Sequence, residues 1–145
     1  MNKTFLFITS IVLIICAILL SKYYSYKEQI NLIEEDNLRY EKYLEKKIKG
    51  NDIASLINQA IDDNERNYIK KDEKGKYIQD DEKSINIEIK ITDFTDEKIF
   101  TMETLYGGGM NEFVKYYGPI SFKSEEIKYN KKGRLSYILF TQIKS

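Results

Sequence analysis

The chain has 145 residues, which leaves room for one domain with one modest core. It carries 23 basic and 23 acidic side chains and contains neither histidine nor tryptophan. The balanced charge disfavours a nucleic-acid-binding protein, because such proteins gain much of their affinity from an excess of Lys and Arg over phosphate. The single cysteine, Cys16, lies in an apolar segment, which excludes disulfides, thiolate zinc sites and Cys–His or Ser–His catalysis from the rest of the chain.

The first predicted element is an uncharged apolar run over residues 5–20, which reads FLFITSIVLIICAILL. A helix of this length spans ~24 Å, and its flanks extend it toward the ~30 Å hydrocarbon core of a bilayer. Tyr23, Tyr24 and Tyr26 follow at the position of an aromatic interface belt. We therefore predict a single-pass transmembrane anchor over residues 1–21, with the lipid bilayer as its partner.

Two alternatives compete with an uncleaved anchor. A cleaved signal peptide shares the short basic start, but residues 19–21 form only a weak cleavage site. Lipidation of Cys16 is disfavoured because Ile15 stands where lipobox sequences carry a small residue. The flanking lysines do not decide the orientation, whereas the very short N-terminal flank resembles a signal anchor and predicts an extracytoplasmic C-terminal domain.

A helical stalk is predicted over residues 22–49, which contain neither glycine nor proline. Its stripe of larger side chains alternates between spacings of three and four, as a coiled-coil seam does. The candidate partner seam consists of Tyr26, Ile30, Ile33, Asn37, Tyr40 and Leu44. Asn37 could specify register in such a seam, but packing of the stripe's C-terminal half on the chain's own globular domain explains the pattern equally well. Gly50, after several lysines, is expected to end the helix.

Residues 50–145 are predicted to form a small α+β domain. It begins with a second, amphipathic helix, capped by Asn51 or Asp52, whose apolar residues recur with helical period from Ile53 to Ile61. A small hairpin is expected around residues 74–76, followed by strands over 85–92 and 99–106, with Phe100 and Met102 facing inward. After the triple glycine 107–109, a short extra helix over 110–117 and strands over 120–129 and 135–144 complete the pattern. The simplest arrangement is an antiparallel sheet of four or five strands, covered by one or two helices.

Carboxylates are the remaining candidates for catalytic or metal-binding groups. Residues 62–73 have acidic ends spaced as in a calcium loop, but Arg66 takes a ligand position and Asn67 replaces the needed glycine. We interpret this segment as the end of a helix and a turn. The triple glycine lacks the lysine of a phosphate-binding loop and is interpreted as a turn. No catalytic residue, no metal site and no cofactor are predicted, and the protein is expected not to be an enzyme.

The segment from Ile48 to Asn58, continuing through residues 60–62 to Asn67, resembles a stretch in uncharacterised, N-terminally anchored proteins of low-GC Gram-positive bacteria. Residues 102–104, Phe113 with Val114 and the closing strands are also similar. The resemblance implies a pilin-like architecture, in which a long N-terminal helix, half in the membrane, carries a small α+β head. The likeness to true type IV pilins is architectural alone, because the prepilin processing signature of Gly, then Phe, with Glu at the fifth mature position, is missing. The resemblance to the uncharacterised proteins carries no function, so no residue roles transfer.

These features lead to two hypotheses of different kinds. The first is a membrane-anchored, non-enzymatic extracytoplasmic protein with a structural or assembly role, as a pilin-like or secretion-associated subunit. Its partners would be the bilayer and either another protein or a second copy bound through the stalk helix, and not a nucleic acid. The alternative is a surface-exposed sensor or ligand-binding module that uses the sheet face and residues 107–117.

Overall fold

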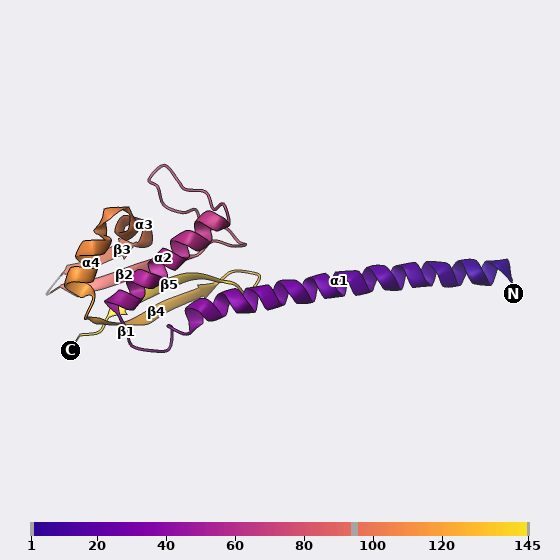
Figure 1. Ribbon diagram of the computed structural model, residues 1–145, viewed down its shortest axis with the longest axis horizontal. Coiled ribbons are helices and arrows are strands. Elements are labelled where there is room, and N and C mark those ends of the chain that lie inside the picture. Colours follow the sequence, from indigo (N-terminus) through magenta and orange to yellow (C-terminus); the bar gives the residue numbers. More distant parts are fainter. Residues whose placement is uncertain (1, 94–95, 145) are drawn as a thin grey trace. The chain divides into compact units, whose positions relative to one another are not determined.

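The computed structural model describes residues 2–93 and 96–144 (Figure 1). Helix α1 (Lys3–Glu41) begins the chain, which divides into two compact units, Met1–Glu35 and Asp36–Ser145. The last turns of α1 therefore belong to the second unit, called the head below. Among the described residues, α1 is the one helix that is long and apolar enough to cross a membrane.

The prediction that the first helix continues to Lys49 is wrong. Helix α1 ends at Glu41, and after a turn the chain enters strand β1 (Ile48–Lys49) and then helix α2 (Gly50–Arg66). Leu44 and Ile48 are both buried in the core of the head, and this burial outweighs the helix propensity of the lysine-rich segment around them.

Helix α2 has the predicted amphipathic face but a different first residue. Its N-cap is Lys49 instead of Asn51 or Asp52, and the backbone N–H of Lys49 donates to the Asp52 carboxylate at 3.0 Å. The apolar side chains of this face are all buried: Ile53, Leu56, Ile57, Ala60 and Ile61. Residues 62–66 form its last turn, in agreement with the interpretation of this segment as a helix end.

The head is an α+β fold with a five-stranded sheet, as predicted, in the order β1-β4-β5-β2-β3. The other strands are β2 (Asn86–Asp93), β3 (Asp96–Thr101), β4 (Ser121–Tyr129) and β5 (Leu135–Gln142). Neighbouring strands are antiparallel except β2 and β5, which are parallel. The prediction of a wholly antiparallel sheet is therefore wrong for one pair of strands. The helical segment between β3 and β4 crosses over the sheet, so that β4 runs in the same direction as β3 and the following strand, β5, runs parallel to β2.

One face of the sheet carries the core. Ile87 and Ile89 of β2 lie beside Ile138 and Phe140 of β5, and all four are fully buried. Helices α2 and α4 (Met110–Tyr117) lie over this face (Figure 1). The opposite face is polar, and there Lys90 lies 3.6 Å from the carboxylates of both Glu97 and Glu125. The sheet therefore has one buried and one solvated face, as the alternation in β2 predicts.

The predicted strand over residues 99–106 ends early, at Thr101. The chain turns there into α3 (Met102–Thr104) and a π-helical turn, η1 (Leu105–Gly109), because the Thr101 hydroxyl accepts the backbone N–H of Thr104. Met102 is fully buried, as expected, but it belongs to helix α3 and not to the predicted strand. Gly108 has a φ of 150°, a value that residues with a Cβ atom rarely adopt.

The hairpin predicted around residues 74–76 is reduced to one isolated bridge between Lys71 and Tyr77 in the described residues. The cause is Asp72, whose carboxylate accepts the backbone N–H groups of Lys74 and Lys76 and closes a tight turn. Backbone bonds from Asp72 N–H to the Lys76 carbonyl and from Ile78 N–H to the Lys70 carbonyl, both 2.8 Å, also cross the loop. The segment is therefore a tight hairpin-like loop whose residues do not form regular strands.

Candidate functional site: the helix-end network

The six residues of the candidate partner seam divide into two groups. Asn37, Tyr40 and Leu44 are buried within the head, with at most 8% of their surface exposed. Tyr26 and Ile30 are exposed on α1, and Ile33 is half-buried. The C-terminal half of the stripe thus packs on the chain's own domain, and only the N-terminal half is left for another partner.

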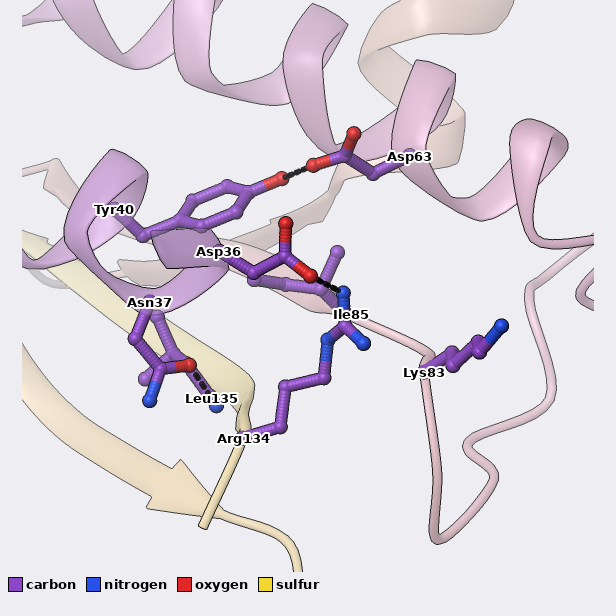
Figure 2. A pocket seen from close by; sticks show the side chains of 8 residues that line it. All are labelled: Asp36, Asn37, Tyr40, Asp63, Lys83, Ile85, Arg134 and Leu135. Atoms are coloured by element: carbon purple, nitrogen blue, oxygen red, sulfur yellow. Dashed lines mark hydrogen bonds and ion pairs between the residues drawn. The ribbon is translucent and has the colours of Figure 1, made fainter. Parts of the chain in front are cut away.

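Asn37 forms a clamp on the start of strand β5. Its side-chain amide donates to the Gly133 carbonyl at 2.8 Å. Its side-chain carbonyl accepts the Leu135 N–H, also at 2.8 Å (Figure 2). Buried backbone groups need such partners, and the strand ladder does not supply one at this point. The polar residue in the stripe therefore orders the chain's own sheet instead of specifying a coiled-coil register.

Asn64 makes an equivalent clamp from helix α2. Its amide donates to the Ile85 carbonyl at 2.7 Å and its carbonyl accepts the Ile85 N–H at 2.9 Å, just before β2 begins. Strands β2 and β5 are the parallel pair, so the two asparagines fix the same end of both strands. In this way α1 and α2 are each tied to one central strand of the head.

Tyr40 connects the end of α1 to α2 directly. Its hydroxyl donates to the Asp63 carboxylate at 2.6 Å (Figure 2). Burial raises the pKa of Tyr40 well above its ordinary value, and the hydrogen bond to Asp63 raises it further. The hydroxyl therefore remains protonated and acts as a fixed donor over the whole physiological range of pH.

Ion pairs complete the cluster, which we call the helix-end network: Asp36, Asn37, Arg39, Tyr40, Asp63, Asn64, Arg66 and Arg134. Arg134, the residue just before β5, pairs with Asp36 of α1 (Figure 2). Arg39 lies 2.9 Å from Asp36 and 3.6 Å from Asp63, and Arg66 lies 3.6 Å from Asp63. The two carboxylates are thus shared among three guanidinium groups that come from α1, α2 and the β4–β5 hairpin.

The network encloses a cavity of about 10 Å³, lined in part by Lys83 and Ile85. This volume holds at most one water molecule. The Lys83 side chain points away from the Asp36–Arg134 pair (Figure 2). The polar groups bind one another, so the arrangement positions the end of a helix and has no room for a substrate.

Larger hollows lie elsewhere on the head, among them a cleft and a groove. The first, which we call the tyrosine cleft, has a volume of about 270 Å³ and is lined by residues that include Tyr77, Glu88, Glu103 and Tyr137. The Tyr137 hydroxyl donates to Glu88 at 2.9 Å, and burial, followed by this bond, raises the pKa of Tyr137. The second, a groove of about 510 Å³, is lined in part by Lys47, Lys49 and Lys144.

The pH dependence of stability provides a test of the Tyr40 bond. Above pH ~10 the unfolded chain loses the Tyr40 proton while the folded chain keeps it, so the free energy of unfolding should fall by about 1.4 kcal/mol per pH unit through this residue. Tyr40→Phe should cost about 1 kcal/mol at pH 7 and then show a shallower decline between pH ~10 and ~12. Urea denaturation at each pH measures the free energy of unfolding of the unaltered chain and of Tyr40→Phe. If the two free energies fell in parallel above pH ~10, the buried Tyr40–Asp63 bond would be contradicted.

Sequence reasoning identified Asn37 and Tyr40 but missed Asp63, Asn64 and Arg134. A usable signal was present, because the chain has only three arginines among its 23 basic residues, and all three belong to this network. Arginine suits partly buried, shared carboxylates better than lysine does, so its placement in a lysine-rich chain marks such sites.

Comparison with known proteins gives no match: neither a protein-family model, nor a curated protein, nor a solved structure is similar to this chain.

Proposed function

We propose that this protein is a membrane-anchored, non-enzymatic subunit with a structural or assembly role, pilin-like in architecture, with its head outside the cytoplasm. The observation that carries the proposal is helix α1: it is helical from Lys3 to Glu41, apolar in its N-terminal part, and tied into the head by its last turn. An anchor and a head that share one helix are what a subunit needs when it must present a folded domain at a membrane.

The apolar part of α1 supports insertion into a bilayer. Phe7, Leu13 and Ile14 each expose at least 60% of their surface, and their neighbours are similarly exposed. Burial of apolar surface is favourable by about 25 cal/mol per Å², so this helix gains much by entering lipid. Its backbone N–H and C=O groups are paired within the helix, as a spanning segment requires.

The exposed half of the seam supports self-association. Tyr26, Ile30 and Ile33 are spaced by four and three residues and so lie on one side of α1. Asn37, Tyr40 and Leu44 are occupied by the head, which leaves a seam of about one heptad for a second copy of the chain. Such a short seam is weak in solution, but anchoring both copies in one membrane raises their effective concentration.

The use of the polar side chains in the head also supports a structural role. The chain contains no histidine. The side chains of the helix-end network bind either one another, as Tyr40 binds Asp63, or the strand backbone, as Asn37 and Asn64 do. Among the described residues, no group of three or more acidic or cysteine side chains is arranged to hold a metal ion.

The anchor can be tested by extraction of cell membranes with alkaline carbonate. The full chain should remain in the membrane pellet, and Leu13→Arg should move a large fraction into the supernatant, because a central charge costs about 3 kcal/mol of insertion free energy. Leu32→Arg, an exposed position outside the apolar run, is the matched control and should stay in the pellet. Release of the unaltered chain would contradict the anchor.

Assembly can be tested by crosslinking lysines after mild detergent extraction. The unaltered chain should give a ladder of oligomers, whereas Ile30→Glu should weaken it by at least about tenfold, because the carboxylate would be buried in the seam. Leu32→Glu adds the same charge on the other side of α1 and should leave the ladder unchanged. A monomer for the unaltered chain would count against an assembly role.

A ligand-binding module is the second candidate, favoured by the tyrosine cleft on the head. Its lining brings two tyrosine rings together with carboxylate and amide groups, which can orient a small polar molecule by hydrogen bonds. A glycan, peptide or divalent ion that binds in the cleft should then raise the melting temperature of the head, which thermal-shift measurements record. The shift should disappear in Tyr137→Ala and persist in Tyr116→Ala, which alters an exposed tyrosine on α4.

A further inference from the structure

Helix α2 ends in an unusual way. The Tyr68 N–H donates to the Glu65 carbonyl and the Ile69 N–H to the Asn64 carbonyl, both at 3.0 Å, which is the pattern of a Schellman motif. The position with left-handed backbone in this motif is usually glycine, but here it is Tyr68, with a φ of 57°. A bulky residue is therefore kept where glycine would be less strained, which points to a role for its side chain.

The Tyr68 side chain has no packing role that would explain this choice. It is 90% exposed, the largest value among the large apolar residues of the described chain, while the next residue, Ile69, packs against the core. Ile78 lies across the loop, half exposed, and its N–H donates to the Lys70 carbonyl at 2.8 Å. Tyr68, Ile69 and Ile78 line a hollow of about 300 Å³, so aromatic and aliphatic surface is displayed together.

Lysines are frequent in the same loop: Lys70 lines the hollow together with Asp80, and Lys71 lies 3.8 Å from the Glu65 carboxylate. The segment 70–76 contains four lysines, Lys70, Lys71, Lys74 and Lys76, all of them exposed, against Asp72 and Glu73. The Asp72 carboxylate is turned onto the backbone N–H groups of Lys74 and Lys76. In a chain whose charges balance overall, the loop of residues 67–78, here named the Tyr68 loop, is locally basic.

We propose that the Tyr68 loop is a lipid-binding surface, in which Tyr68 and Ile78 enter the interfacial layer of a bilayer and the lysines bind the phosphates of anionic headgroups. An amphipathic tyrosine beside lysines suits the boundary between headgroups and acyl chains. The loop begins shortly after Asp63, the partner of Tyr40, so it lies at the end of the head that holds the last turns of α1. The inference rests on the proposed anchor, because a chain held in the membrane by α1 meets lipid at a high effective concentration, which lets weak contacts accumulate.

The absence of tryptophan from the chain gives a clean reporter. The full chain carrying Tyr68→Trp is inserted into nanodiscs of phosphatidylcholine, with or without phosphatidylglycerol, whose acyl chains are brominated. In the anionic discs, tryptophan emission should shift to shorter wavelength and be quenched at least about twofold more than in the zwitterionic discs, because anionic lipid attracts the lysines. Tyr116→Trp, exposed on α4, is the matched control and should show water-like emission in both.

Charge and apolar contact can then be separated. Lys70→Gln with Lys74→Gln should abolish the extra quenching of the Tyr68→Trp reporter, whereas Lys131→Gln with Lys132→Gln, which removes two lysines paired with Asp81 and Glu82, should not. With the reporter moved to Ile78→Trp, Tyr68→Gly should also reduce quenching, although this variant should melt at or above the temperature of its parent because backbone strain is relieved.

The outcomes that overturn the proposal are distinct from failure of the anchor. A chain that does not co-elute with the discs contradicts the anchor. A Tyr68→Trp chain that co-elutes but shows unquenched, water-like emission, or equal quenching in both lipids, overturns the lipid-binding loop. Shielding of the Tyr68→Trp reporter in native membranes but not in anionic nanodiscs also overturns it, in favour of a protein partner.

Discussion

Replacing Gly50 by alanine should lower the free energy of unfolding of the head by at least about 2 kcal/mol. A Cβ atom at this position would lie 2.1 Å from the Tyr117 carbonyl oxygen and 2.7 Å from its carbon. Both are backbone atoms, so the start of α2 and the end of α4 would have to separate. The Gly50 N–H also donates to the Ile120 carbonyl at 3.0 Å, which fixes the two segments together.

Urea denaturation followed by circular dichroism, with the full chain in a mild detergent, measures this effect. Gly107→Ala is the matched control, because nothing lies within 4 Å of its added Cβ, and it should change stability by less than about 0.5 kcal/mol. Equal effects of the two substitutions would show that the close approach at Gly50 is not a constraint on the fold.

Asn64→Ala is the second substitution with a large expected effect. Asn64 is fully buried, and its loss leaves both the N–H and the C=O of Ile85 without a partner. Each unpaired buried group costs about 1–3 kcal/mol, so the loss of both partners should cost about 2–6 kcal/mol. The free energy of unfolding, measured with urea, should fall accordingly, and hydrogen exchange at Ile85 should accelerate.

The control for Asn64 is Asn58→Ala on the exposed side of the same helix. Alanine has the higher helix propensity, so this variant should be neutral or slightly stabilising. If Asn64→Ala were equally neutral, the clamp on β2 would contribute nothing, and the order at the start of the parallel pair would need another explanation.

Strong local patterns explain what the sequence predicted correctly. The helical period of Ile53 to Ile61, the alternation in β2, and the β4–β5 hairpin with its turn at Gly133 each depend on residues close together in the chain. A period of 3.6 or 2 is visible without any tertiary information. The α+β class and a sheet of four or five strands were predicted from such elements, but β1 was not among the predicted strands.

The errors in the fold came from tertiary contacts. The end of α1 was misplaced because Leu44 and Ile48 enter the core, and Gly50 was assigned to a helix end although it permits a close approach to Tyr117. The parallel β2–β5 pair depends on how residues 102–120 cross the sheet, which local periodicity does not determine.

The helix-end network was also beyond local reasoning. Arg134 and Asp36 are 98 positions apart in the chain, as are Asn37 and Leu135. Asn37 fits a coiled-coil register position and a clamp on a strand equally well by spacing alone. Only the fold shows that its amide is used within the head, which also shortens the seam left for partners.

The division of the stripe on α1 is the central claim, and disulfide crosslinking in membranes tests it most directly. In a Cys16→Ser background, single cysteines are placed at Ile30, in the exposed half of the seam, and at Leu32, on another side of the helix. After oxidation, Ile30→Cys should form a disulfide-linked dimer efficiently and Leu32→Cys should not. No dimer at Ile30, or equal dimer at both positions, would contradict self-association through this seam.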